Sequence, residues 1–269
     1  MIRRREDLPT GRARLVAVIK AAGDVVRIED AAQALGVPRT QAAKLLSRWV
    51  AQGWMRRVGK GTYVPVQLEL LDAETVVQDS WILVPALFAP AYIAGRTAAE
   101  HWDLTEQIFR DIVVCTARPV RERTIERQSA VFTLKHIRED LIFGTKPVWR
   151  GQTKVAVSDI HRTIVDMLDD PALGGGIQHV ADCFDRYLQR PDLDTEKLIG
   201  YAERLGNGAI FKRLGFLAER HPLGGALVQA SKDRLTQGHA KLDPALQCGR
   251  LVTRWRLRVP ETWIKGRGA

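Results

Sequence analysis

Two short helical patterns joined at a glycine set the strongest constraint on how this chain folds. Residues 28–35 repeat apolar side chains at helical spacing and end at Gly36. A second pattern runs from about residue 39 to 52 and ends at Gly53. Two helices joined by a tight turn that contains glycine form a helix-turn-helix unit. The spacing therefore predicts this unit near the N-terminus.

Small side chains and a preceding helix support the same unit. Residues 15–19 are apolar at helical spacing, and Gly23 is expected to end that first helix. Ala31 and Ala32 are small enough to let two helices approach closely, and Val37 is expected to fill the corner between them.

The helix over residues 39–52 has two faces of opposite character. Its apolar face is expected to point inward and holds Ala42, Leu46, Trp49 and Val50, with Leu45 beside them. Its outer face holds Arg39, Thr40, Gln41, Ala43, Lys44, Ser47 and Arg48. Three cations and no carboxylate occur there. This combination suits a recognition helix that lies against phosphates and reads base edges in the major groove.

The segment after Gly53 predicts a wing. Residues 54–58 and 62–64 have the character of two short strands, and Gly59-Lys60-Gly61 predicts the turn between them. The wing would carry the cations Arg56, Arg57 and Lys60. We expect it to touch the DNA backbone or minor groove. Winged helices also serve as protein-docking modules, but those usually lack a basic face, and this one retains it.

Charge is distributed very unevenly along the chain. Residues 1–64 contain 13 Lys or Arg against 5 Asp or Glu, a net of +8, whereas the remaining 205 residues have 28 against 26, a net of +2. Such asymmetry indicates a polyanion-binding module attached to a nearly neutral body. A solvated basic surface is the alternative.

Positions on the helix and wing give each side chain an expected role. Thr40, Gln41 and Lys44 are expected to reach base edges, with Ser47 on the same face. Phosphate contacts are expected from Arg39, Arg48, Arg56, Arg57 and Lys60. Neutralising about six phosphates would give a slope of about −5 in a plot of the logarithm of the binding constant against the logarithm of the salt concentration.

The remainder of the chain is expected to form a separate, larger domain, with residues 1–66 and 67–269 as the two domains. Expected helices cover residues 68–80, 91–102, 158–169, 177–189, 195–205 and 208–220. Expected strands cover residues 110–117, 129–136, 146–150, 154–157 and 250–259. Strands early and helices late indicate an α+β fold.

Three constellations in the body resemble catalytic or binding motifs. Asp159, Arg162 and Asp166 share one helix face, where an ion-pair ladder is favoured over a metal site. The Asp192-Leu193-Asp194 stretch resembles paired aspartates of nucleotidyltransferases, but a helix cap is favoured. Residues 174–176 are three glycines, which form either an anion-binding nest or, more simply, a flexible turn.

We expect no catalytic residue, metal or cofactor. Cys115, Cys183 and Cys248 are odd in number and far apart, which suits reduced thiols. The six histidines show no metal-ligand spacing. The chain has no apolar run long enough to span a membrane and no secretory signal, so we expect a cytoplasmic protein.

The last expected strand carries a row of cations. Strict alternation over residues 250–259 would place four arginines on one face: Arg250, Arg254, Arg256 and Arg258. They are a possible second surface for nucleic acid or a partner. Pairing with acids of the same domain is favoured, because that domain is nearly neutral.

The order of these features resembles the AbiEi family, the antitoxin and transcriptional autorepressor of AbiE-type toxin–antitoxin systems. In the N-terminal module the resembling stretches are residues 32–36, 46–53 and 57–63. In the body they are residues 92–102, 104–107, 161–166 and 212–217, with Pro171 and residues 175–177 between the last two. The resemblance spans about residues 28–220.

The resemblance implies a winged helix that binds inverted repeats in its own promoter, followed by a mixed α/β antitoxin domain. It also implies a functional partner, a nucleotidyltransferase-like toxin, that the antitoxin need not bind stably. Two alternatives stay open. One is a metal-dependent nuclease or nucleotidyltransferase with a DNA-binding head, whose activity would depend on Asp159 and Asp166. The other is a protein-interaction adaptor whose winged helix contacts the toxin.

Overall fold

The structure is a computed structural model and describes residues 11–66 and 79–264. The chain divides into two compact units. The first contains residues 1–89 together with two later segments, 126–130 and 148–155. The second contains residues 90–125, 131–147 and 156–269. Within the described residues, no helix has the length and apolar character needed to cross a membrane.

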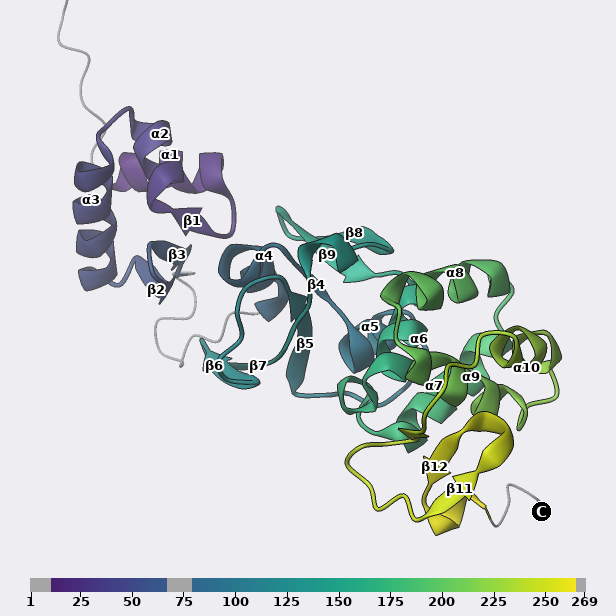
Figure 1. Cartoon of the computed structure of the whole chain (residues 1–269). Coiled ribbons are helices and arrows are strands. Elements are labelled where there is room, and N and C mark those ends of the chain that lie inside the picture. The colour runs from purple at the N-terminus through teal and green to yellow at the C-terminus, as the bar shows by residue number, and fades with distance from the viewer. Residues whose placement is uncertain (1–10, 67–78, 265–269) are drawn as a thin grey trace, which may run out of the picture. The chain divides into compact units, whose positions relative to one another are not determined.

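The first unit begins with a winged helix (Figure 1). Its elements in chain order are α1 (Gly11–Ala22), β1 (Val26–Arg27), α2 (Ile28–Leu35), α3 (Arg39–Ala51), β2 (Met55–Gly59) and β3 (Thr62–Pro65). The strands form an antiparallel sheet in the order β1-β3-β2. Both helices of the helix-turn-helix and both strands of the wing are confirmed within about two residues. Strand β1 was not foreseen, because two residues are too short for a sequence pattern.

One core holds these elements together. Ala42 and Leu46 of α3 are fully buried, and Trp49 is almost completely buried. They pack with α1, α2 and the wing through Leu15, Val18, Val26, Ala31, Met55 and Tyr63. Val37 packs against this core, as its place in the corner predicts. The apolar face of α3 is thus fixed inward, and its other face must point outward.

Two local features shape the helix-turn-helix. Gly36 ends α2 in the left-handed region at φ 61°, and its N–H bonds to the carbonyls of Ala32 and Gln33. At the other end of α2, the carboxylate of Asp30 accepts a hydrogen bond of 2.8 Å from the backbone N–H of Arg27. The turn into α3 therefore has a defined geometry.

After the winged helix, the described chain resumes at residue 79. Elements η2 (Ser80–Ile82) and α4 (Leu83–Phe88) follow. The helix expected over residues 68–80 lies almost wholly outside the described residues. Near this point, the Arg150 guanidinium lies 4.3 Å from the centre of the Trp81 ring.

A six-stranded mixed sheet has the order β6-β7-β5-β4-β9-β8. Its strands are β4 (Ala91–Ile93), β5 (Asp111–Thr116), β6 (Thr124–Arg127), β7 (Ala130–His136), β8 (Thr145–Arg150) and β9 (Thr153–Ser158), and η3 (Glu139–Leu141) lies between β7 and β8. The strands expected over residues 110–117, 129–136, 146–150 and 154–157 are confirmed.

The helix expected over residues 91–102 is only half correct. Residues 91–93 form β4, which pairs with β5 and β9, and α5 covers Gly95–His101. Gly95 separates the two at φ 55°. A Cβ there would overlap the backbone of Leu173, so the break needs glycine.

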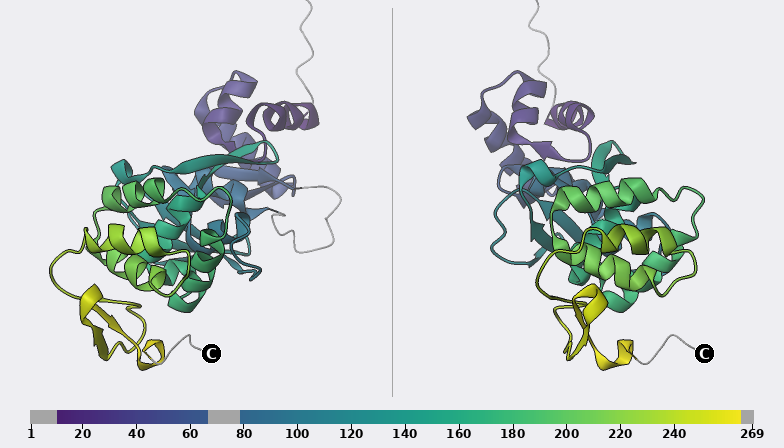
Figure 2. Two further views of the ribbon diagram at one scale, coloured as in Figure 1. Left: turned by 90° about the vertical axis from the view of Figure 1, so that its right-hand side faces the viewer. Right: turned by 45° about the vertical axis from the view of Figure 1, so that its right-hand side comes forward.

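Helices dominate the second half of the chain, as predicted. They are α6 (Ile160–Asp169), α7 (Ile177–Leu188), α8 (Thr195–Leu205), α9 (Gly208–Ala218) and α10 (Gly225–Lys232), with η4 (Pro171–Gly174) between α6 and α7. The views of Figure 2 show these green helices gathered in one group. Ile164, Phe184, Leu198 and Leu214 meet in their shared core. The α+β fold is confirmed.

Two buried cations of α9 fix the chain that follows. Lys212 is 3% exposed and donates to Thr236 Oγ1 and to the carbonyls of Gln237 and Gly238. Arg213 is 4% exposed and donates only to backbone carbonyls, at Leu168, Asp169, Lys241 and Leu242. Backbone carbonyls, together with the hydroxyl of Thr236 for Lys212, therefore accept the hydrogen bonds of both cations.

The expected strand over residues 250–259 is wrong. The chain forms β11 (Arg250–Val252), η5 (Thr253–Trp255) and β12 (Leu257–Val259), and β12 also pairs with β10 (Ala240–Lys241); η6 (Glu261–Trp263) follows. Arg256 has φ 50°, and β11 and β12 run antiparallel to each other. Apolar and polar residues therefore alternate in the sequence although the chain reverses direction. One of the apolar residues, the fully buried Trp255, lies in the turn itself.

Candidate nucleic-acid interface

The outward face of α3 presents six of the nine side chains that were predicted to meet DNA. Arg39, Thr40, Gln41, Lys44, Ser47 and Arg48 are exposed, whereas the opposite face is buried. Among the described residues, Lys44 and Arg48 form no ion pair within 4.0 Å. Their charges are therefore available to a polyanion.

Arg39 has a neighbour that was not foreseen. Its guanidinium lies 2.9 Å from a carboxylate oxygen of Glu29 on α2, and both side chains are largely exposed, at 72% and 58%. An exposed pair of this kind contributes only about 0–1 kcal/mol. A phosphate can compete with Glu29 for Arg39, so the pair orients this arginine without neutralising it permanently.

The wing places its three predicted cations differently. Arg57 and Lys60 are exposed, and Nε of Arg57 donates to the carbonyl of Gly59 at 3.1 Å. Arg56 is half-buried, and its NH1 donates to Oε1 of Gln128 at 3.3 Å. Gln128 was not singled out from the sequence, since no local pattern marks a residue 72 positions away as a neighbour of the wing.

The row of four arginines near the C-terminus does not exist as one face. Arg250 and Leu251 lie opposite Val259 and Arg258 across the β11–β12 pair, and Leu251 is exposed while Val252 is buried. Arg250 pairs with Glu261 at 2.9 Å, and Arg254 pairs with Glu219 at 2.7 Å. Arg256 donates to the Thr236 carbonyl. The single face predicted for Arg250, Arg254, Arg256 and Arg258 is therefore wrong, and the favoured pairing with acids of the same domain is confirmed for Arg250 and Arg254. A contact of these arginines with nucleic acid or a partner stays a prediction.

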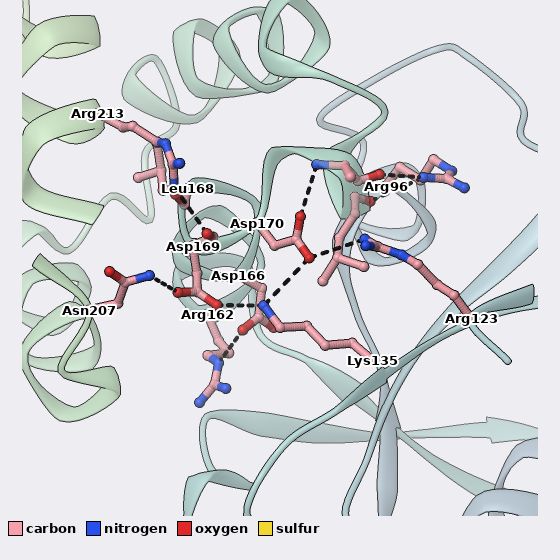
Figure 3. A network of polar contacts seen from close by, with 12 residues as sticks. Arg96, Arg123, Lys135, Arg162, Asp166, Leu168, Asp169, Asp170, Asn207 and Arg213 are labelled. Carbon is pink, nitrogen blue, oxygen red and sulfur yellow. Dashed lines mark hydrogen bonds and ion pairs between the residues drawn. The ribbon is translucent and has the colours of Figure 1, made fainter. Parts of the chain in front are cut away.

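The body contains a buried polar network that spans α6 and the sheet (Figure 3). Arg162 donates to Asp166 at 2.8 Å and to the hydroxyl of Tyr92 at 2.7 Å, and the Tyr92 hydroxyl donates to Asp166 at 3.1 Å. Lys135 of β7 reaches Asp169 at 2.5 Å. The ion pair predicted between Arg162 and Asp166 is therefore present, and it is buried rather than a surface ladder.

Burial governs the protonation of this network. It raises the pKa of Asp166, and the guanidinium of Arg162 beside it opposes that shift. Burial also raises the pKa of the Cys115 thiol to about 12, so that cysteine stays a thiol at neutral pH. Arg162 itself is fully buried and needs its partners.

A cavity of about 310 Å³ opens beside the network. Its lining includes Lys135, Arg162, Asp166 and Asp169, and it also includes His136, Arg138 and the apolar side chains of Ile137, Leu141 and Leu205. Lys135 is paired with Asp169, and Arg162 is paired with Asp166.

The carboxylates once considered for metal binding have structural partners. Asp159 caps α6 by accepting from the N–H of Arg162 at 2.9 Å, and its other oxygen contacts Lys197 and Tyr201, each at 2.9 Å. Asp194 caps α8 by accepting from the N–H of Lys197. Asp192 pairs with Arg190. Within residues 11–66 and 79–264, no group of three or more His, Cys, Asp or Glu side chains is placed to hold a metal ion.

A carboxylate of the protein binds at the start of α7, directly after the three glycines. Gly175 and Gly176 have φ 83° and 98°, and the buried carboxylate of Asp243 accepts from the N–H of Ile177 at 3.0 Å. An acidic side chain at a helix N-terminus is favourable. At the start of α7, a carboxylate of the protein itself, that of Asp243, thus occupies the place that an external anion would take in a nest.

Comparison with known proteins identifies the N-terminal module. Residues 13–66 match the family model AbiEi_4, described as a transcriptional regulator, AbiEi antitoxin. The chain carries an AbiEi antitoxin regulator domain. The resemblance seen in the sequence is confirmed for this segment, which contains α3 and the wing of the AbiEi domain.

The whole fold has a counterpart among solved structures. The crystal structure of the RV2827C protein from Mycobacterium tuberculosis matches with a TM-score of 0.62 at 18% identity, over 95% of this chain and 93% of that one. At this identity the likeness concerns the fold alone. No curated protein matches the chain.

Proposed function

We propose that the protein is a sequence-specific DNA-binding antitoxin that represses its own operon. The observation that carries this proposal is the outward face of α3 in an AbiEi domain: six exposed polar or basic side chains without a carboxylate. That surface suits insertion into a major groove, where a recognition helix meets phosphates and base edges together.

The proposal assigns separate roles within the surface. Thr40, Gln41 and Lys44 lie toward the N-terminal half of α3, the part of a recognition helix that contacts bases. Arg39, Arg48, Arg57 and Lys60 meet phosphates. The DNA target is a set of inverted repeats in the protein's own promoter, and the protein acts in the cytoplasm.

The body is proposed to counteract a nucleotidyltransferase-class toxin, without a catalytic step of its own. The internally paired charges of the body support a binding or structural role. Co-expression with the product of the adjacent gene tests this part. Growth is expected to be rescued by the full chain, and continued toxicity would contradict the assignment.

Fluorescence anisotropy with the full chain tests the DNA-binding part. The probes are a duplex from the promoter upstream of its own gene and a scrambled duplex of equal length. We expect preference for the promoter duplex and a log–log salt slope of about −4, because each of the four phosphate contacts contributes about 0.9 to the slope. A salt-independent affinity would contradict DNA binding.

Variants separate base contacts from phosphate contacts in the same assay. Gln41→Ala or Lys44→Ala should relax the preference for the promoter duplex, since a good base contact discriminates by about 1–3 kcal/mol. Arg57→Ala should weaken binding to both duplexes about equally. Equal losses on both duplexes for Lys44→Ala and Gln41→Ala would contradict their role in base recognition.

A further inference from the structure

The turn between β6 and β7 contacts the wing through one side chain. Nε2 of Gln128 donates to the backbone carbonyl of Arg57 at 3.1 Å, and Oε1 of Gln128 accepts from NH1 of Arg56 at 3.3 Å. Both ends of the amide are thus used on two consecutive residues of β2. The turn, residues 126–130, belongs to the same compact unit as the winged helix.

The edge strand β2 provides a hydrogen-bond acceptor for Gln128. The wing sheet has the order β1-β3-β2, so β2 is its edge strand, and on one side β2 pairs with no other strand of the described residues. Edge strands present backbone carbonyls without a sheet partner. The amide of Gln128 satisfies such a group at Arg57 and thereby holds the edge of the wing in place.

The turn itself has an unusual conformation. Gln128 and Ser129 have φ 53° and 61°, and they form the two-residue loop between β6 and β7. Left-handed conformations at both positions of such a loop favour Asn and Gly, and neither residue here is glycine. A sparsely populated backbone conformation persists where surrounding contacts maintain it. The two bonds of Gln128 to β2 are such contacts.

The two arginines of the wing differ in what their guanidinium groups face. Arg57 is exposed, and its Nε bonds within its own turn. Arg56 is half-buried and directs NH1 at Gln128. A guanidinium held by a protein amide in this way is not presented to DNA as the exposed one is.

We propose that Gln128 is a positioning residue for the wing and that Arg56 is its tether, not a phosphate ligand. This inference rests on the proposed DNA-binding function. Phosphate contacts of the wing then come from Arg57 and Lys60, and Gln128 acts on DNA affinity only through β2.

The salt dependence of DNA binding tests this assignment, because each phosphate contact contributes about 0.9 to the log–log slope. The probe is a mixed-sequence 30-base-pair duplex, bound by the full chain over a range of salt concentrations. Arg57→Ala should make the slope shallower by about one. Arg56→Ala and Gln128→Ala should leave the slope unchanged and weaken binding about fivefold, equivalent to about 1 kcal/mol. The double variant should lose no more than Gln128→Ala alone, because that variant already removes both bonds to β2.

Ser129→Gly is the matched control, since it relaxes the turn but retains the amide of Gln128. It should bind like the wild type, and circular dichroism checks that every variant is folded. If the wild type shows no salt-dependent binding, the proposed function itself fails. If the wild type binds but Arg56→Ala loses about one unit of slope, Arg56 is a phosphate ligand and the inference is wrong. A steeper slope or unchanged affinity for Gln128→Ala would also overturn it.

Discussion

Buried histidine gives this protein a pH-sensitive group at the scale of the single residue. His161 is 6% exposed, and its Nδ1 lies 2.9 Å from the hydroxyl of Tyr187. Burial raises the pKa of Tyr187, so its hydroxyl keeps its proton and donates to the backbone carbonyl of Asp194 at 3.5 Å. Burial of the imidazole of His161 lowers its pKa and favours its neutral form.

We predict that stability falls with acidification through His161. Burial lowers the pKa of His161 below its ordinary 6.5, although the nearby Asp159 opposes the shift. As pH falls below about 6.5, the unfolded chain takes up this proton before the folded one does, so acid favours unfolding. Urea unfolding at pH 7, 6 and 5 should show a steeper loss for the wild type than for His161→Gln.

His239 provides the control for that experiment, because it is exposed in a loop. His239→Gln should follow the wild-type pH dependence. Parallel curves for the wild type and His161→Gln would show that His161 is not responsible.

At the scale of the element, close packing decides which side chains fit at each position of a helix. Helix α9 passes so near the ring of Trp255 that Gly215 has no room for a side chain: a Cβ at this position would overlap the ring. Trp255 is fully buried, and its Nε1 donates to Glu219 at 2.9 Å. The ring is thus fixed at both its apolar face and its N–H.

We predict opposite effects for the same substitution in two helices. Gly215→Ala should destabilise the protein by about 1–3 kcal/mol, the usual cost of overpacking a core. Gly200→Ala in α8 meets nothing within 4 Å and should stabilise it by about 0.5–1 kcal/mol, because alanine favours helix over glycine. Chemical denaturation measures both, and equal effects would contradict the packing at Trp255.

Elements also show where sequence patterns fail. Residues 91–93 have a helical pattern, yet they form a strand because β5 and β9 offer backbone partners on both sides. Residues 250–259 alternate like one strand, yet they reverse direction at η5. In both cases a long-range partner overrides local preference.

At the scale of the whole molecule, charge is concentrated where DNA is expected to bind. The net charge of +8 over residues 1–64 contrasts with +2 over the other 205 residues. The body contains almost as many acids as bases, and Arg250 and Arg254 are each paired with one of those acids. The polyanion-binding surface should therefore be confined to the AbiEi domain.

We predict that the combined change of Arg250→Gln and Arg254→Gln leaves the salt slope of DNA binding unchanged. Both arginines already face carboxylates at 2.9 and 2.7 Å, so their loss releases no phosphate contact. Salt titration of duplex binding by the full chain measures this. A slope shallower by about two would show that Arg250 and Arg254 contact phosphates and would contradict this prediction.

The sequence by itself determined the N-terminal winged helix and the outward face of α3. Both follow from local rules, since helical spacing, Gly36 and the Gly-Lys-Gly turn involve only near neighbours. The helix cap predicted for residues 192–194 was likewise local and is formed by Asp194, whereas the cap at Asp159 was not predicted.

Only the tertiary structure decided which charges remain open to a partner. Arg56 meets Gln128, Arg254 meets Glu219 and Asp243 meets the start of α7, across separations of 72, 35 and 66 residues. Such pairs depend on how distant elements pack, and a periodic pattern contains no information about them. For this reason the outward face of α3 could be predicted from the sequence. The long-range partners of the charged side chains became known only from the fold.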